Sequence, residues 1–124
     1  MKTKNINREE IITFVNKNYN IKEEYLWKKY PRYCVFRNMK NRKWFGIIMN
    51  INAKKIGLDN DEEIDILVVK CESTLKDILL DKRGFLPAYH MNKNNWITIL
   101  LNGSCKINEI EKLIKHAYEL VDYR

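Results

Sequence analysis

Side chains suited to chemistry gather in the short stretch from Tyr89 to Trp96. His90 and Lys93 can donate hydrogen bonds to a phosphate group, and Asn92 can pair with a base edge or a backbone amide. The rings of Tyr89 and Trp96 can stack on bases. This combination of donors and rings suits either a nucleic-acid site or a site for a small anion.

The same stretch also has a structural interpretation. Pro87 stiffens the loop, and the rings of Tyr89 and Trp96 are large enough to anchor it in the core. Asn92 can satisfy the backbone of its own turn. We expect Trp96 in the core, since apolar burial is the commonest use of an aromatic side chain. The roles of the other residues stay open at this point.

A second group of candidates forms a basic hairpin tip between two predicted strands. It carries four cations and two amides, namely Arg37, Lys40, Arg42, Lys43, Asn38 and Asn41. A protruding tip of this kind can contact phosphates or enter a groove of DNA. Equally, hairpin tips are commonly polar and solvated, and lysines near a sheet edge protect against aggregation.

Positive charge is concentrated in the first part of the chain. Residues 1–55 hold 14 Lys and Arg against 4 Asp and Glu, a net +10, whereas residues 56–124 hold 9 against 12, a net −3. This asymmetry favours a polyanionic partner. Trp27, which precedes two lysines and a tyrosine, either joins an aromatic and basic surface continuous with the hairpin or packs beneath the first helix.

Catalysis and metal binding are not favoured by the sequence. His90 has no neighbouring carboxylate in the sequence to orient it, and no Gly-x-Ser-x-Gly nucleophile motif is present. His116 has no second histidine or cysteine at ligand spacing, so we expect it at the edge of a helical apolar stripe. The acidic stretch from Asp59 to Asp65 lacks EF-hand spacing and is expected to be a solvated turn. We therefore expect neither enzymatic activity nor a metal or other cofactor.

Length and composition predict one domain of 124 residues, 45% of them hydrophobic, around one core. The longest apolar runs, 44–49 and 64–69, fall far short of the roughly 20 residues of a membrane-spanning helix, and the N-terminus has no secretory apolar stretch. Three widely spaced cysteines, Cys34, Cys71 and Cys105, indicate neither disulfides nor zinc and are expected to be reduced and partly buried. We expect a cytoplasmic protein, either a monomer or a weak dimer.

Periodicity predicts a helix and three strands in the first 70 residues. Asn7 with Glu10 forms a capping-box pattern, which starts a helix that runs to about Lys17. Strands are expected over residues 33–37, 43–51 and 63–70. In the second strand, strict alternation places Trp44 on one face and the core residues on the other. The predicted core residues of that strand are Phe45, Ile47, Met49 and Ile51.

The second half of the chain predicts a helix, a strand and a final helix. The elements expected are a short helix capped by Ser73 or Thr74, a loop over 85–95, a strand over 96–101, and a helix that Asn108 caps and that ends near Asp122. Strands that are not separated by regular helices favour antiparallel pairing. The sequence therefore predicts an α+β domain with a largely antiparallel sheet and helices packed on it.

The stretch from Pro87 to Trp96 resembles the signature of the MmcQ/YjbR family. It reads Pro-Ala-Tyr-His-Met-Asn-Lys-Asn-Asn-Trp, and it matches every fixed position of the family pattern Pro-x-Tyr-His-Met-Asn-Lys-x-x-Trp. Residues 43–45 and 116–121 also resemble family segments, with Ala117 where the family usually has Ser. The likeness covers residues 7–123.

The resemblance implies a CyaY-like, double-wing fold and DNA binding without catalysis. Under this expectation the contacts to DNA come from Arg37, Lys40, Arg42, Lys43, His90, Asn92 and Lys93, with stacking by Tyr89 and Trp96. The rival expectation is a protein or small-anion interaction module, whose pocket is formed by Tyr89, His90, Asn92 and Lys93.

Overall fold

The computed structural model describes residues 8–123, which form three α-helices, one 3-10 helix and five strands. The elements are α1 (Arg8–Tyr19), β1 (Cys34–Arg37), β2 (Trp44–Asn52), η1 (Ala53–Ile56), β3 (Glu63–Lys70), α2 (Ser73–Leu79), β4 (Phe85–Pro87), β5 (Trp96–Leu100) and α3 (Ile107–Val121). The cap predicted at Asn7 lies outside the described residues. None of the described helices is long and apolar enough to cross a membrane.

The strands form one sheet in the order β1-β2-β3-β5-β4, and each neighbouring pair is antiparallel. Strand β3 lies in the middle, so that Ile66 has Met49 of β2 opposite it on one side and Leu100 of β5 on the other. This arrangement confirms the predicted α+β class with an antiparallel sheet, and it confirms the hairpin formed by β1 and β2.

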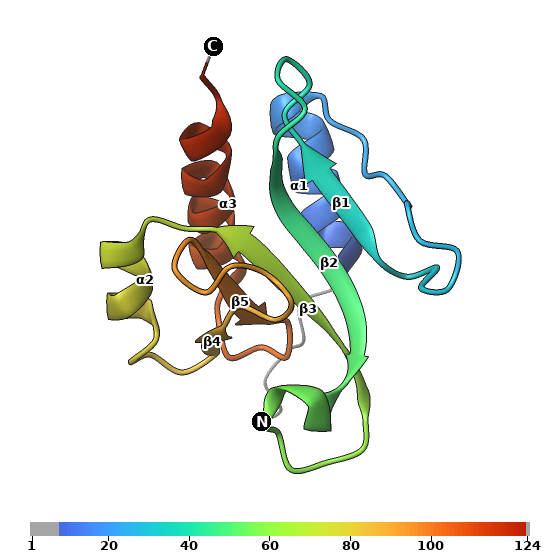
Figure 1. The fold of residues 1–124 in the computed structure, drawn as a ribbon, viewed down its shortest axis with the longest axis vertical. Helices are drawn as coiled ribbons and strands as arrows, with labels where there is room; N and C mark the ends of the chain where they lie inside the picture. Colours follow the sequence, from blue (N-terminus) through green and yellow to red (C-terminus); the bar gives the residue numbers. More distant parts are fainter. Residues whose placement is uncertain (1–7, 124) are drawn as a thin grey trace.

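Helices α1 and α3 cover one face of the sheet and lie behind it in Figure 1. The apolar stripe predicted for the last helix packs there through Ile110, Ile114 and Ala117, beside Ile11 and Val15 of α1. The strand residues beneath the helices include Phe36, Phe45, Ile48, Leu67, Val69 and Ile99. Full burial of one such side chain stabilises a fold by about 1.5–3 kcal/mol. This layer is the main core because it holds the larger of the two clusters of buried side chains.

The opposite face of the sheet is covered by loops and the short η1 rather than by α-helices (Figure 1). Its buried residues are Val35, Ile47, Met49, Ile51, Ile66, Val68, Ala88, Trp96 and Leu100. Partly buried rings lie over them, among which Trp27 and Tyr33 precede β1 and Tyr89 follows β4. We call this the loop-covered face. Both faces of the sheet are therefore apolar.

A bulge in β2 changes the faces that strict alternation predicts. Phe36 pairs with Gly46 and Arg37 pairs with Trp44, which leaves Phe45 as the extra residue. Phe45 therefore packs on the helix side, whereas the other predicted core residues of this strand lie on the loop-covered face with Trp44. The predicted common face is wrong at Phe45 because an extra residue shifts the alternation by one position.

The helix starts differ from the predicted caps. The N-cap of α2 is Glu72 rather than Ser73 or Thr74, and the N-cap of α3 is Lys106 rather than Asn108. Neither side chain makes a capping hydrogen bond. In both cases the N-cap backbone is extended and the next residue is already helical, so the polar residues that were expected to cap lie inside the first turn.

The short strand β4 falls in a stretch predicted as a loop. Its three residues, Phe85–Pro87, pair with β5 at the edge of the sheet. Three residues are too few to show alternation, and a proline is tolerated at an edge because its missing N–H removes no bond to a further strand. This edge strand leads directly into the signature stretch.

Candidate nucleic-acid interface

The segment between α1 and β1 holds three aromatic side chains at the edge of the loop-covered face. Glu24 and Val35 exchange two backbone hydrogen bonds of 3.0 and 2.9 Å, which fasten the segment to the sheet. Two turns follow, in which the N–H of Tyr30 donates to the carbonyl of Trp27 (3.2 Å) and the N–H of Tyr33 donates to that of Tyr30 (3.0 Å). The backbone thus brings the three rings together.

These three rings and Trp44 form what we call the aromatic wall. Trp27 packs edge to face with Tyr33 (centroids 6.0 Å apart) and with Trp44 (5.8 Å), while Tyr30 stacks on Tyr33 at 4.7 Å. Such ring pairs stabilise by about 0.5–1.5 kcal/mol beyond their buried area. Burial, together with the nearby hydroxyls of Tyr89 and Tyr30, raises the pKa of Tyr33. Tyr33 is therefore uncharged at neutral pH.

The signature loop, residues 87–93, lies across from this wall. The N–H of Tyr89 donates to Oγ1 of Thr98 (2.9 Å), which is fully buried in β5. The ammonium of Lys93 donates to the carbonyl of Ala88 (2.9 Å). These bonds join the backbone of the loop to the sheet and the loop to itself.

His90 has an unusual backbone conformation within the signature loop. Its φ of 58° is left-handed, a region that costs an L-residue roughly 1–2 kcal/mol. Its side chain is exposed, and its ring meets Tyr89 edge to face at 4.0 Å. Strained residues of this kind persist where the surroundings over-determine them, and they cluster at ligand sites.

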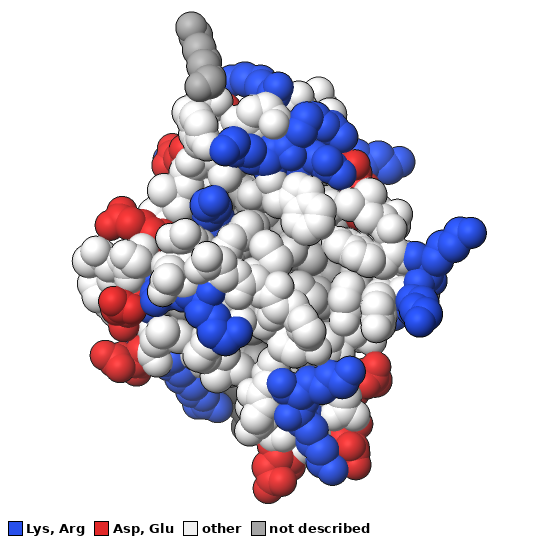
Figure 2. Space-filling view, in the orientation of Figure 1, with Lys and Arg blue, Asp and Glu red and all other residues white. Residues whose placement is uncertain are grey.

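A groove of about 430 Å³ lies between the aromatic wall and the signature loop. Its lining consists of Trp27, Tyr30, Tyr33, Trp44, Ile47, Met49, Lys55, Tyr89, His90 and Met91. Among the described residues, neither a carboxylate nor a thiol lines it. Figure 2 shows this side of the molecule, with a pale area over its middle, Lys and Arg around that area, and most of the Asp and Glu farther out.

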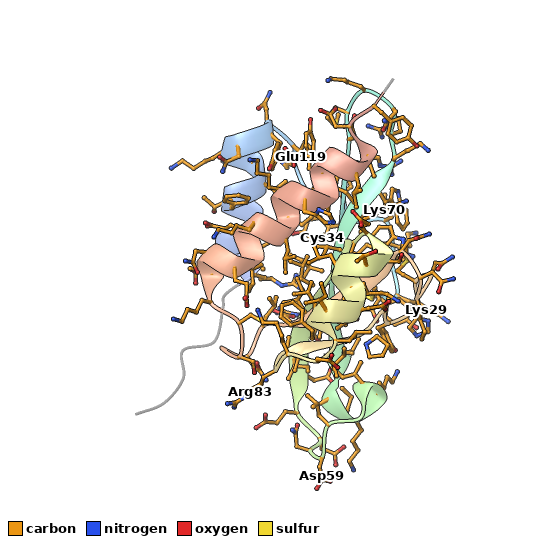
Figure 3. The ribbon with its side chains drawn as sticks, turned by 90° about the vertical axis from the view of Figure 1, so that its left-hand side faces the viewer. Lys29, Cys34, Asp59, Lys70, Arg83 and Glu119 are labelled. Atoms are coloured by element: carbon orange, nitrogen blue, oxygen red, sulfur yellow. The ribbon has the colours of Figure 1, made fainter. Side chains whose placement is uncertain are left out.

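Several cations lie around the groove. Lys55 lines it and also lines an adjoining hollow of about 430 Å³, together with His90 and Lys93. Lys29 and Lys70 lie on the side of the sheet away from α1 and α3 (Figure 3). Cations at these positions attract phosphate groups, whereas the rings between them offer apolar surface.

Two residues of the signature stretch, Trp96 and Asn92, contact other parts of the protein and do not line the groove. Trp96 is 6% exposed and belongs to the core, as expected, so its ring face is not offered to a base for stacking. The Oδ1 of Asn92 accepts from the N–H of Asn94 (2.8 Å), as the structural interpretation of that residue expected. The candidates that line the groove or the adjoining hollow are therefore Tyr89, His90 and Lys93.

The basic hairpin tip is tied to the end of α3. Asn38 is fully buried, and its Nδ2 donates to Oδ1 of Asp122 (2.9 Å). The Nδ2 of Asn41 donates to the carbonyls of Val121 (2.6 Å) and Tyr123 (2.9 Å). Carbonyls in the last turn of a helix lack partners within the helix. The two asparagines therefore have a structural role that the sequence analysis did not identify.

Each of the four hairpin cations has a partner among the described residues. The pairs are Arg37 with Glu24 (2.9 Å), Arg42 with Glu24 (3.7 Å), Lys40 with Asp122 (3.3 Å) and Lys43 with the ring of Tyr123 (4.8 Å to its centroid). Exposed ion pairs contribute about 0–1 kcal/mol, so Lys40, 76% exposed, can exchange its partner for a phosphate. Arg37, 18% exposed, is less available.

The acidic stretch joins a different hollow, of about 740 Å³. Asp65 there accepts from Nε of Arg8 (3.1 Å) and from Nδ2 of Asn50 (3.0 Å), and Arg32 lies 3.7 Å away. The carboxylate is thus held by cations and an amide of the protein itself. Within residues 8–123, no group of three His, Cys, Asp or Glu is placed to hold a metal ion.

The three cysteines are free and buried, as expected. Burial raises the pKa of each thiol to about 11, so the nucleophilic thiolate is scarce at neutral pH. His116 lies at the edge of the apolar stripe of α3, where its Nε2 accepts from the backbone N–H of Glu72 (3.2 Å). None of these groups contributes to the groove.

Sequence reasoning missed most of the aromatic wall. Trp27 was left with two interpretations, and its position beside Trp44 favours the surface one. Tyr30, Tyr33, Trp44 and Lys55 were not identified as site residues. A signal was available over residues 25–33, where aromatic and basic residues are mixed, but it gives no indication of the loop that lies opposite.

Comparisons with known proteins agree with the signature. The YjbR family model matches residues 17–120. The Bacillus subtilis protein YyaQ, described as uncharacterised, is 41% identical over 115 residues, which are 93% of this chain and 98% of that protein. A Pseudomonas syringae protein of known crystal structure is 42% identical, with a TM-score of 0.90, over 93% of this chain and 98% of its own.

A more distant structure supports the fold alone. A Deinococcus radiodurans protein with a DUF419 domain has a TM-score of 0.74 at 17% identity, over 100% of this chain and 84% of its own. Similarity at this level of identity supports the arrangement of helices and strands but gives no information on side-chain chemistry.

Proposed function

The chain belongs to the YjbR family, and from this premise we propose that it is a non-enzymatic protein that binds DNA through the groove and the cations around it. One observation carries the proposal, namely that aromatic rings lie in the middle of a face whose surroundings are basic. Rings bind bases by stacking, and cations bind the phosphates on either side.

The contacts of the proposal come from two regions. Tyr89, His90 and Lys93 of the signature loop act with Lys55 at the groove and the adjoining hollow. The basic hairpin supplies further phosphate contacts, mainly through Lys40, because its present partner is a weak surface pair. DNA contact by this hairpin is also what the family resemblance implies.

The lining of the groove favours binding over catalysis. Of the described lining residues, His90 is the best suited to acid-base chemistry, and no lining carboxylate is available to orient it. General acid-base or nucleophilic catalysis requires a positioned pair of groups. A binding role uses the same side chains without this requirement.

The proposal is tested by fluorescence-anisotropy titration of labelled DNA at low and at near-physiological salt. The variant Lys28→Gln/Lys29→Gln/Lys55→Gln removes one cation from the groove lining and two from the segment between α1 and β1. The control Lys106→Gln/Lys112→Gln/Lys115→Gln removes the same charge from the start and exposed face of α3. We expect only the first to weaken binding and to lower the salt slope, by roughly 0.7–0.9 per lost phosphate contact. Equal effects of the two variants would contradict the assignment of this face.

A second candidate function is supported by the hollow beside the groove. Three basic side chains, Lys55, His90 and Lys93, line it together, which suits a small anion. A bound anion at 100 times its Kd raises the free energy of unfolding by about 2.7 kcal/mol. A rise in Tm with inorganic phosphate or a nucleotide, without any response to DNA, would favour this function over the first.

A further inference from the structure

We infer that the groove accepts an unpaired base, so that this protein prefers single-stranded over double-stranded nucleic acid. The inference rests on the proposed function, because it names the form of nucleic acid that the same site takes. It goes beyond that proposal, since cations on a surface bind duplex and single strands alike.

The two-sided lining of the groove favours an unpaired base over a paired one. The aromatic wall and the signature loop stand on either side of it, and Ile47 and Met49 of β2 lie between them. A base inside a duplex is covered on both faces by its neighbours and is paired along one edge, so it must leave the helix to enter such a site. An unpaired base needs no such step.

The wall offers accessible ring surface. Tyr30 is 49% exposed although it stacks on Tyr33, and Trp27 and Tyr89 are only partly buried. The edge-to-face contact of Trp27 with both neighbours holds its plane in place. Stacking on a ring that is already fixed loses little side-chain entropy on binding.

The distribution of charge suits a nucleic-acid strand that places a base inside the groove and its phosphate backbone outside the groove. Within the described lining, Lys55 is the only Lys or Arg, while Lys29 and Lys70 lie on the same side of the molecule (Figure 3). The mostly apolar interior favours a base, whereas the surrounding cations favour the phosphates that flank it. Because no amide side chain lines the groove among residues 8–123, binding should tolerate different bases.

The inference is tested by comparing three labelled ligands, namely an oligothymidine, an abasic strand of the same length and charge, and the corresponding duplex. Stacking of one base strengthens binding by about 5- to 150-fold, so we expect the oligothymidine to bind more tightly than both others. Equal affinity for all three would overturn the inference but leave standing the binding of DNA through the cations. No binding to any of them would overturn the proposed function itself.

Variants of single tyrosines identify the rings that stack on the base. Tyr30→Leu and Tyr89→Leu should remove most of the preference for the oligothymidine over the abasic strand. Tyr25→Leu, which removes an equally exposed ring outside the groove lining, should retain it. A preference that survives in both groove variants would contradict the inference.

The unmodified protein gives a second measurement, which does not depend on the folding of any variant. Trp27 and Trp44 line the groove and Trp96 lies in the core. The oligothymidine should therefore quench tryptophan fluorescence, whereas the abasic strand should not. Quenching of the same size by both strands would count against a base in the groove.

Discussion

Trp27 and Trp44 pack edge to face on the loop-covered face of the sheet, with ring centroids 5.8 Å apart and planes at 80°. Trp27 belongs to the segment before β1, and Trp44 is the first residue of β2. Their contact depends on the bulge at Phe45, which puts Phe45 on the helix side and leaves Trp44 on the loop-covered side. One irregularity in the β1–β2 pairing therefore contributes to forming the aromatic wall.

We expect Trp27→Ala to lower the free energy of unfolding by about 2 kcal/mol, less than a fully buried aromatic would lose, because Trp27 is only half-buried. Leu26→Ala, at the exposed neighbouring position, is the control and should change it by no more than about 0.5 kcal/mol. Urea unfolding followed by circular dichroism measures both. A loss as small for Trp27 as for Leu26 would contradict a supporting role for the wall.

Neutralising the basic hairpin should weaken nucleic-acid binding for every sequence and flatten its salt dependence. The variant replaces Arg37, Lys40, Arg42 and Lys43 with glutamine, and its control replaces Lys17, Lys106, Lys112 and Lys115, exposed residues of α1 and α3 or the N-cap of α3. Each lost phosphate contact lowers the slope of log K against log salt by roughly 0.7–0.9. An unchanged slope, measured by anisotropy titration, would exclude the hairpin from the interface.

Replacing His90 with glycine separates backbone strain from ligand contact. Glycine adopts a positive φ without strain but is more flexible when unfolded, so the free energy of unfolding should stay within about 1 kcal/mol of the original. Binding should weaken several-fold because the ring is lost. Asn20→Gly changes another residue of positive φ, 55°, outside the groove lining, and should leave affinity unchanged. Unchanged affinity in His90→Gly would remove His90 from the site.

The contact between the hairpin and α3 should make stability depend on acid pH. Hydrogen bonds from Asn38 and Lys40 lower the pKa of Asp122 below its ordinary 3.8. A carboxyl whose pKa is lower in the folded chain stabilises the fold above its unfolded pKa, and this stabilisation is lost as the pH falls through the folded value. We therefore expect Asp122→Asn to show a shallower fall of Tm below about pH 4 than the unchanged protein.

The control for this measurement is Asp59→Asn, which removes one exposed carboxylate from the turn before β3. The two variants carry the same net charge, so any general effect of charge on Tm is shared. A fall of Tm with acid that is identical in both variants would contradict a specific contribution from Asp122.

The buried cysteines should react slowly with a thiol reagent at neutral pH. Burial raises the pKa of Cys34, Cys71 and Cys105 to about 11 and also blocks access to the sulfur. We expect little reaction in the native protein and complete reaction of all three thiols in urea. Rapid reaction of any one of them without denaturant would show that the region around it opens readily.

The sequence by itself determined the fold class, most of the helices and strands, and the family. Apolar periodicity over residues 110–121 predicted the last helix, and fixed residue types from Pro87 to Trp96 identified the signature. These features are local, since each depends on residues a few positions apart in the chain. The burial of Trp96 was also predictable, because large apolar rings are usually placed in the core.

Only the tertiary structure decided which residues share a site. The bulge that places Trp44 beside Trp27 is a feature of the pairing between β1 and β2. The alternation of apolar and polar residues within one strand does not reveal such a bulge. Likewise the hairpin looked free in the sequence because two of its partners, Asp122 and Tyr123, lie at the other end of the chain, and Glu24 lies in the segment between α1 and β1. Contacts between distant segments form only when the strands pair into the sheet. A local sequence pattern therefore determines single helices and strands but not the groove that forms between them.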